Sequence, residues 1–231
     1  MSPGDGRALI LLRNADYRAG RIDAALQRFR EAIEAMRSAG AVIVDSVFIQ
    51  EQADIPLGRR WCPRFKYDLE NYLATLGQDA PYATLDEIVQ SGRFHPYIRS
   101  SMQFFQGIEE TPDEHAGCQT ARQNQERLRV GVRRVMQETQ LDAIVYPTWS
   151  NPPRLIGDLT SPHGDNSQDL APHTGFPALT VPMGYVRDRL PVGLQILGDA
   201  WSEPTLIAIA SGFEAVTRHR RPPATTPPIE P

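Results

Sequence analysis

The sequence has almost no lysine and very little cysteine. Lys66 is the single lysine among 24 basic residues, and the other 23 are arginines. A mechanism that needs a lysine base therefore has one candidate. Two cysteines, Cys62 and Cys118, exclude a disulfide framework and a zinc site with four cysteine ligands. We expect them to be separate thiols in a reducing compartment rather than the partners of one bridge.

Long apolar runs and an excess of positive charge are also missing. No stretch approaches the roughly 18 consecutive apolar residues of a membrane-spanning helix. Residues 1–6 lack the basic and apolar regions of a signal peptide. The formal net charge is −4, whereas a dedicated nucleic-acid binder is usually basic. We therefore expect a cytoplasmic protein whose partners include neither nucleic acid nor a membrane.

The first 50 residues predict a strand, a helix and a second strand. The apolar run 8–12 is typical of a strand buried on both faces, and residues 41–49 are rich in β-branched side chains. Between them, Gly40 is placed to end a helix whose apolar residues recur every three or four positions. These residues are Ile22, Leu26, Phe29, Ile33 and Met36. Such a unit has parallel strands and a right-handed crossover. The turn at 13–17 lacks both G-x-G-x-x-G and Walker glycines, so no nucleotide cofactor is expected.

The middle of the chain predicts helices. One helix face is formed by Phe65, Leu69, Tyr72, Leu73 and Leu76. Thr84 and Glu87 form a capping box that opens a short helix. Thr111 and Glu114 form a second box, which predicts a long polar helix reaching about Gln140.

From Leu141 the pattern returns to strands. Residues 141–146 predict a strand that Pro147 stops, and a loop rich in proline, glycine, asparagine and aspartate follows to about Phe176. Two further strands are predicted at 178–182 and 192–197, joined through residues 184–191. A last helix begins at Ser202, a candidate N-cap. Its inward residues are Leu206, Ile209, Ala210, Phe213 and Val216. We expect a proline-rich, disordered tail over residues 224–231.

No complete catalytic or metal-binding set is visible in these patterns. The five histidines form neither H-x-x-x-H nor H-E-x-x-H, so no metal site is expected. His163 and His173 share the long loop with three aspartates, which suits a metal or acid–base site but is ordinarily a solvated group. The aspartates are Asp158, Asp165 and Asp169. The pair Ser100-Ser101 lacks the flanking glycines that expose a nucleophile on a tight turn.

The turn 149–153 follows the carboxyl end of a predicted strand, where open α/β sheets bind ligands. Trp149 either lines a pocket there or caps the core.

Several segments, in the same order and spacing, resemble the amidase signature family. Residues 141–148 (LDAIVYPT) are similar to its strand and turn "LDALVxPT". Residues 174–184 (TGFPALTVPMG) resemble "TGxPALTVPxG", and residues 190–198 (LPVGLQILG) resemble "LPVGLQxxG". The closing helix matches from Glu203 through Pro222. Upstream, residues 65–73 resemble "FKxDLNxYL" and residues 40–45 resemble "GAxVVxV", so the resemblance extends from about residue 8 to residue 223.

The resemblance implies an α/β fold: a three-layer α/β/α arrangement around a mixed β-sheet core. It also implies hydrolysis of carbon–nitrogen amide bonds by a serine, activated by a second, cis-configured serine and a lysine. In the family, a glycine-rich loop stabilises the oxyanion. The chain contains no "GGSxGG"-like block, Lys66 aligns with the helical "FK" segment, and Ser100-Ser101 matches no catalytic serine. No catalytic residue is therefore assigned.

We interpret residues 1–223 as the C-terminal portion of an amidase-signature domain, inactive alone. Thr148, Trp149 and Asn151 are the candidate substrate-binding residues, and a small-molecule amide is expected only in a complete enzyme. The expected partners are an N-terminal half or a second copy, bound through an exposed sheet edge. No cofactor or metal is implied. The alternative is a non-catalytic subunit or binding module that completes or regulates a partner amidase.

Overall fold

The computed structural model describes residues 7–10, 23–44, 47–149, 151, 153–160 and 167–222; for residues 7–10, 23 and 24 it describes the backbone alone. The chain divides into two compact units. Unit 1 comprises residues 1–52 and 128–231, and unit 2 comprises residues 53–127. Helices α2 (Gln50–Asp54) and α6 (Ala116–Glu138) each begin in one unit and end in the other.

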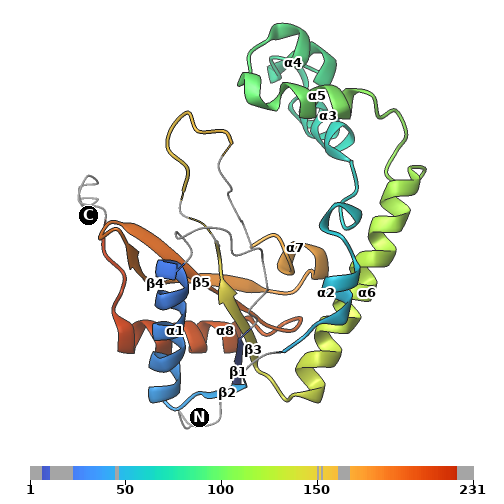
Figure 1. Cartoon of the computed structure of the whole chain (residues 1–231). Helices are drawn as coiled ribbons and strands as arrows, with labels where there is room; N and C mark the ends of the chain where they lie inside the picture. Colours follow the sequence, from blue (N-terminus) through green and yellow to red (C-terminus); the bar gives the residue numbers. More distant parts are fainter. Residues whose placement is uncertain are drawn as a thin grey trace. The chain divides into compact units, whose positions relative to one another are not determined.

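Unit 1 contains a mixed five-stranded sheet (Figure 1). Its strands are β1 (Arg7–Ile10), β2 (Val42–Val44), β3 (Ala143–Pro147), β4 (Ala178–Val186) and β5 (Leu190–Leu197). Their order is β2-β1-β3-β5-β4. β1 pairs in parallel with β2 and β3, whereas β5 is antiparallel to both β3 and β4. The predicted parallel pairing of the first two strands is confirmed.

One face of this sheet is covered by α1 (Asp23–Ser38) and α8 (Glu203–Thr217) (Figure 1). The two helices and three strands bury one apolar cluster, which contains Phe29, Ile33, Met36, Ala143, Val145, Val181, Met183, Leu194, Ile196, Leu206, Ala210 and Phe213. Every second residue of β3 and β5 joins it because successive strand side chains alternate between faces. Gly40, at φ 97°, ends α1 as predicted. Val216 was expected to point inward, but it is exposed near the end of α8.

The opposite face of the sheet is also covered. Ile144 and Tyr146, which alternate with the core residues of β3, are buried. Figure 1 shows α7 (Ala171–Thr174) and the C-terminal half of α6 on that side. The α6 residues Leu128, Val132, Val135 and Met136 are buried there as well. Helices on both faces of a mixed sheet give the expected three-layer α/β/α fold.

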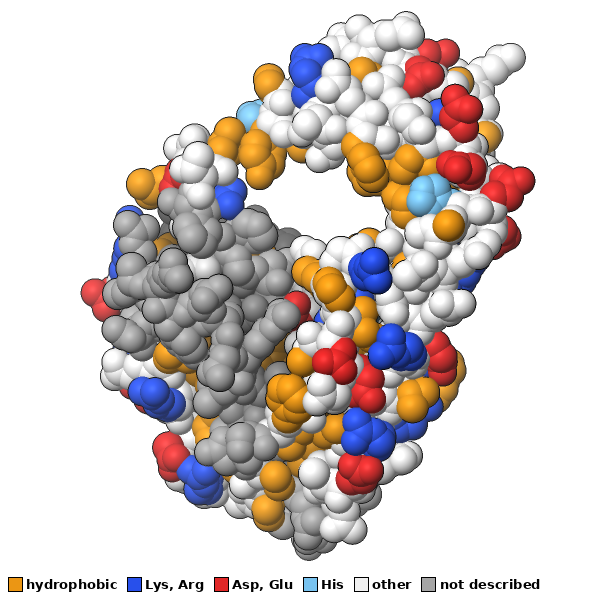
Figure 2. All heavy atoms as spheres, turned by 45° about the vertical axis from the view of Figure 1, so that its right-hand side comes forward, with side chains coloured by type: hydrophobic (Ala, Val, Ile, Leu, Met, Phe, Trp, Pro, Cys, Tyr) orange, Lys and Arg blue, Asp and Glu red, His pale blue; other side chains and the backbone are white. Residues whose placement is uncertain are grey.

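Unit 2 is helical. Its helices are α3 (Phe65–Leu76), α4 (Leu85–Ser91), α5 (Arg99–Gln106) and the first half of α6, with short 3-10 turns η1 (Leu57–Arg59), η2 (Gly77–Asp79) and η3 (Pro96–Ile98). The predicted apolar face of α3 buries only Leu73, and Phe65, Tyr72 and Leu76 are exposed. Figure 2 shows hydrophobic side chains on the surface of this unit. Unit 2 therefore has little core of its own.

The two predicted capping boxes behave differently. Glu87 N–H donates to Thr84 Oγ1 (3.2 Å), and α4 begins at the next residue after Thr84, as expected. At the second box, Thr111 donates its hydroxyl (2.8 Å) and its backbone N–H (3.1 Å) to Glu114. Both hydrogen bonds lower the pKa of Glu114 below its ordinary value, and the bond from the hydroxyl has the larger effect. They close a separate turn, and α6 begins only at Ala116.

Other boundaries also differ from the sequence prediction. The second strand comprises Val42–Val44, which is shorter than the predicted residues 41–49, and α2 begins at Gln50. The link between β4 and β5 is a tight hairpin turn at residues 187–189, so both strands are longer than predicted. Ser202 occupies the N-cap position of α8 without a capping side-chain hydrogen bond. The predicted turn at 13–17 and the tail 224–231 lie outside the described residues.

The expectation of two separate thiols is wrong. Cys62 and Cys118 form a disulfide, with Cα atoms 4.2 Å apart. They are 56 positions apart in sequence, and the chain leaves through α3 and returns at the start of α6 before they meet. Sequence spacing alone could not reveal that return. In the chain-entropy account, closing a loop of this length stabilises a fold by about 4 kcal/mol.

Among the described residues, no helix is both long and apolar enough to cross a membrane.

The core of unit 1 gives a first prediction. Ile196 is fully buried in β5, one residue before the end of the strand, so Ile196→Ala should lower the free energy of unfolding by about 2–5 kcal/mol. Chemical denaturation followed by circular dichroism measures this change. Ile207→Ala, at an exposed position on α8, is the matched control and should change stability by less than about 1 kcal/mol. Equal effects of both substitutions would contradict the assignment of this core.

Candidate functional site

The segment after β3 is held against the sheet by a backbone hydrogen bond. Thr148 N–H donates to the carbonyl of Gly193 in β5 (2.8 Å). A Cβ atom on Gly193 would lie 2.7 Å from both Thr148 Oγ1 and Thr180 Cγ2, which is too close for a real contact. Glycine is therefore required at this position, because two threonines from β4 and the β3 terminus meet over it.

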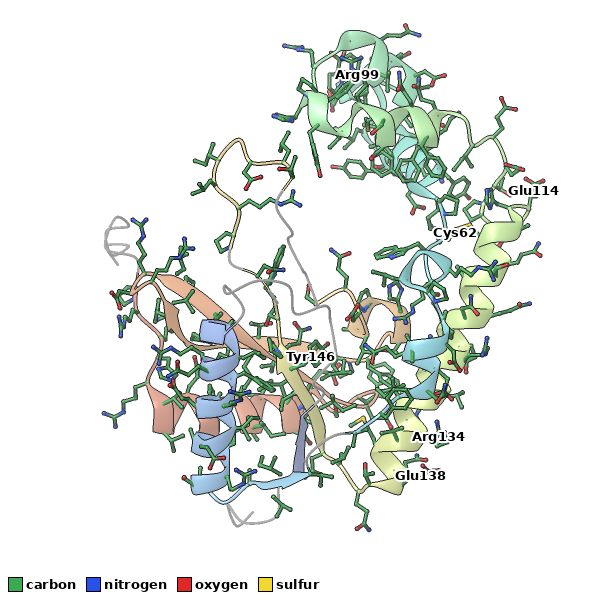
Figure 3. The ribbon with its side chains drawn as sticks, in the orientation of Figure 1. Cys62, Arg99, Glu114, Arg134, Glu138 and Tyr146 are labelled. Atoms are coloured by element: carbon green, nitrogen blue, oxygen red, sulfur yellow. A yellow bond between two sulfur atoms is a disulfide. The ribbon has the colours of Figure 1, made fainter. Side chains whose placement is uncertain are left out.

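A row of polar side chains crosses three strands at this point. Tyr146 of β3 and Thr180 of β4 both pair in register with Gln195 of β5. Thr180 Oγ1 donates to Gln195 Oε1 (3.3 Å), and the hydroxyls of Thr148 and Thr180 are also 3.3 Å apart. Tyr146 and Gln195 are buried, Thr148 is half-buried and Thr180 is exposed. The row thus leads from the interior of the sheet, where Figure 3 labels Tyr146, to the solvent.

The three sequence-predicted binding residues lie at the outer end of this row. Thr148 belongs to it directly. Trp149 is next in the chain and is 42% exposed. Asn151 is half-buried, and among the described residues its side chain makes no hydrogen bond to the row. The structure therefore connects Thr148 to the polar row, and Trp149 and Asn151 follow it in the chain.

Two arginines of α6 hold the segment that precedes β4. Arg129 Nε donates to the carbonyl of Thr174 (2.7 Å) at the end of α7. Arg133 lies over the ring of Phe176 at 5.3 Å and forms an ion pair with Asp199 (3.0 Å). The sequence analysis predicted this helix but assigned no role to either arginine. Their spacing of four, which places them on one helix face, was the available signal.

Asp158, Asp169 and His173, the described members of the histidine and aspartate set in the long loop, do not form one group. Asp169 and His173 are buried in and beside α7, whereas Asp158 accepts hydrogen bonds from Thr160 within its own exposed loop. His163 and Asp165 lie outside the described residues. In the described part of the chain, no three histidine, cysteine, aspartate or glutamate side chains are grouped so as to hold a metal ion.

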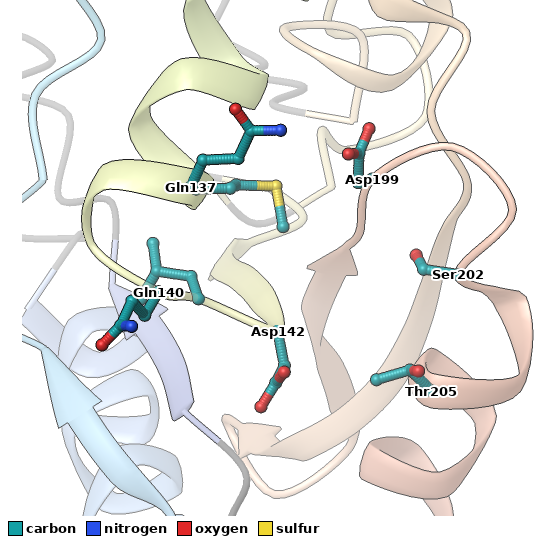
Figure 4. A pocket seen from close by; sticks show the side chains of 8 residues that line it. Gln137, Gln140, Asp142, Asp199, Ser202 and Thr205 are labelled. Carbon is teal, nitrogen blue, oxygen red and sulfur yellow. The ribbon is translucent and has the colours of Figure 1, made fainter.

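A cavity of about 420 Å³ lies at the other end of β3 (Figure 4). Asp142, which precedes β3, and Asp199, which follows β5, are part of its wall. The remaining lining residues are Met136, Gln137, Gln140, Leu141, Ser202 and Thr205. Because Thr148 follows the carboxyl end of the same strand, this cavity does not contain the candidate site.

The polar row can bind a polar group but offers no activated nucleophile. Its hydroxyl groups and the Gln195 carboxamide donate and accept hydrogen bonds, as the carbonyl and N–H of an amide require. The only lysine is in unit 2, where Lys66 Nζ donates to the carbonyl of Gln106 (3.3 Å). Ser100 and Ser101 are exposed on α5 of the same unit. No serine–lysine pair is formed by the residues that the structure describes.

Comparison with known proteins agrees with this architecture. The family described as Amidase matches residues 18–207. A probable amidase of Arabidopsis thaliana is 28% identical over 202 residues, which cover 83% of this chain and 36% of that protein. An indoleacetamide hydrolase of Agrobacterium vitis is 32% identical over 118 residues, covering 46% of this chain and 25% of that protein.

Solved structures give the same result. The native peptide amidase of Stenotrophomonas maltophilia superimposes with a TM-score of 0.73 at 29% identity, over 95% of this chain and 44% of that one. A bacterial aryl acylamidase of the amidase signature family, at 16% identity and a TM-score of 0.67, shares the fold. The chain thus spans less than half the length of these relatives. Because the family match covers most of the sequence, the chain belongs to the amidase signature family.

Proposed function

We propose that this chain forms the C-terminal part of an amidase-signature hydrolase that cleaves carbon–nitrogen amide bonds, and that it is inactive alone. The polar row over β3, β5 and β4 carries the proposal, since it offers hydrogen-bonding groups suited to an amide at the carboxyl end of a sheet strand. The proposed inactivity of the chain alone is supported by the missing "GGSxGG"-like block, because the serine nucleophile and its oxyanion donors have no counterpart in the given sequence.

The segment Thr148–Asn151 is proposed as one wall of the substrate pocket. Thr148 supplies a hydroxyl whose position is fixed by Gly193 and Thr180. Trp149 offers a large exposed ring beside it, which suits an apolar part of the substrate. The proposed substrate is a small-molecule amide, bound once the catalytic residues are supplied.

The proposed partner is the N-terminal part of an amidase, with a second copy of this chain as the substitute when that part is missing. The described sheet ends in β2 and β4. An edge strand presents backbone N–H and C=O groups that form no hydrogen bonds to a strand on its outer side. Val42 in β2 is 48% exposed, so this edge of the described sheet carries an exposed apolar side chain.

The first test is of activity. The purified chain should hydrolyse no aliphatic or aromatic amide, and a fluorophosphonate probe for activated serines should leave it unlabelled. Mixing it with the N-terminal half of a homologous amidase tests completion, and turnover that needs both parts supports the proposed role. Labelling at Ser100 or Ser101 in the chain alone would show that it carries its own nucleophile and would refute the proposal.

The second test is of the sheet edge. The chain alone should self-associate with rising concentration, measured by analytical ultracentrifugation. Val42→Lys should weaken this association, because a charged side chain on an edge strand opposes pairing. Val130→Lys, at an exposed position on α6, is the control and should leave it unchanged. A chain that stays monomeric and melts in a sharp, reversible transition would contradict self-association through an exposed edge strand.

The third test is of Trp149. In a complete enzyme containing this segment, Trp149→Ala should reduce kcat/KM for an aromatic amide about tenfold relative to a small aliphatic amide, since it removes one apolar wall. Trp201→Ala, which replaces another exposed tryptophan of unit 1, is the control. An unchanged ratio of kcat/KM values between the two substrates would remove Trp149 from the pocket.

A further inference from the structure

The disulfide joins the two ends of the α3–α5 loop of unit 2, and we call this closure the neck. Cys62 precedes α3 by three residues, and Cys118 is the third residue of α6. The loop between them contains all of α3, α4 and α5. Figure 3 labels Cys62 beside the upper end of α6.

Few buried apolar side chains hold this loop in its folded form. Among its described residues, only Leu73, Leu85 and Met102 are large apolar side chains buried from solvent. Several aromatic side chains of the loop are instead exposed: Phe65, Tyr67, Tyr72, Tyr97 and Phe104. Small folding units with so few buried side chains commonly depend on a covalent staple.

The other contacts at the neck are of two kinds. On the side away from the loop, α6 is tied to η1 by Asn124 Nδ2 and Gln125 Nε2, which donate to the carbonyls of Arg59 (3.0 Å) and Arg60 (2.8 Å). On the loop side, the exposed ion pairs Arg64–Asp68 and Arg122–Asp113 each join residues at one end of the loop and do not bridge its two ends. Exposed ion pairs add little to stability. Among the described residues, the disulfide is the covalent link between the two ends of the loop.

The surroundings of the two sulfurs differ. Cys118 is 1% exposed and lies in the first turn of the 23-residue helix α6, whereas Cys62 is half-buried. An incoming thiolate therefore reaches the Cys62 sulfur more easily. The Cys118 sulfur would leave as a thiolate at a helix N-terminus, where the N–H dipoles favour negative charge. This arrangement makes reduction at Cys62 the accessible route.

We propose that Cys62 and Cys118 form a thiol–disulfide exchange site, at which a dithiol reductant opens the neck and destabilises the α3–α5 loop while unit 1 stays folded. One thiolate of the reductant attacks the Cys62 sulfur, the S–S bond breaks and Cys118 leaves with the electron pair. The second thiol of the reductant then attacks the mixed disulfide and releases Cys62. The dithiol is oxidised to its own disulfide, and the chain gains two thiols. The proposal is independent of the amidase role.

Limited proteolysis of the full chain with trypsin tests it, with dithiothreitol as the reductant. Reduction should speed cleavage after Arg93 and Arg99, in the loop, about tenfold or more, because cleavage follows the population of the open form. Cleavage after Arg28 and Arg37 in α1 of unit 1 should not change. The double variant Cys62→Ala/Cys118→Ala is the control, and it should be cleaved rapidly in the loop with or without dithiothreitol.

Iodoacetamide labelling under denaturing conditions gives a second readout that does not depend on folding. Mass spectrometry should find no labelled cysteine in the oxidised chain and two after dithiothreitol, and reoxidation should restore slow cleavage of the loop. Two labelled cysteines before reduction would overturn the disulfide. A disulfide that forms, with identical cleavage rates before and after reduction, would overturn its control of the loop.

Discussion

The structure depends on the alternation of side chains along β5. Leu194 and Ile196 point into the cluster formed with α1 and α8, while Gln195 points to the other face and joins the polar row. A strand has a side-chain period of two, so a shift of one residue in its pairing would exchange these faces and bury the carboxamide in the apolar cluster. The pairing of β5 with both β3 and β4 therefore fixes the core and the candidate site together.

Close backbone approach then decides where the polar row ends. Gly193 lets Thr148 and Thr180 meet over β5, because any larger residue would occupy the space of both. Arg129 and Arg133 of α6 hold the segment from Thr174 to Phe176, which leads into β4. The site thus rests on residues from four elements, of which only the β3 terminus was selected from the sequence.

Much of the fold could be predicted because its signals are local. The helix ended by Gly40, the capping box of Thr84 and Glu87 and the parallel strands β1 and β2 follow from periodicity and short motifs. The box at Thr111 gave the wrong start for α6, because the same side chains can close a turn that no helix continues. Arg129 donates to a carbonyl 45 positions away, and Gly193 faces Thr148 and Thr180 from two other segments of the chain. No local sequence pattern reveals partners at such distances.

By itself, the sequence determined the family, the α/β class and the absence of a glycine–serine catalytic block, since these are properties of residue order. Only the tertiary structure decided which groups the two cysteines and the single lysine contact. It joins the two cysteines across 56 positions, and it commits the only lysine to the carbonyl of Gln106. Both outcomes require the chain to fold back on itself. Composition counts such residues, but only the path of the backbone determines which of them meet.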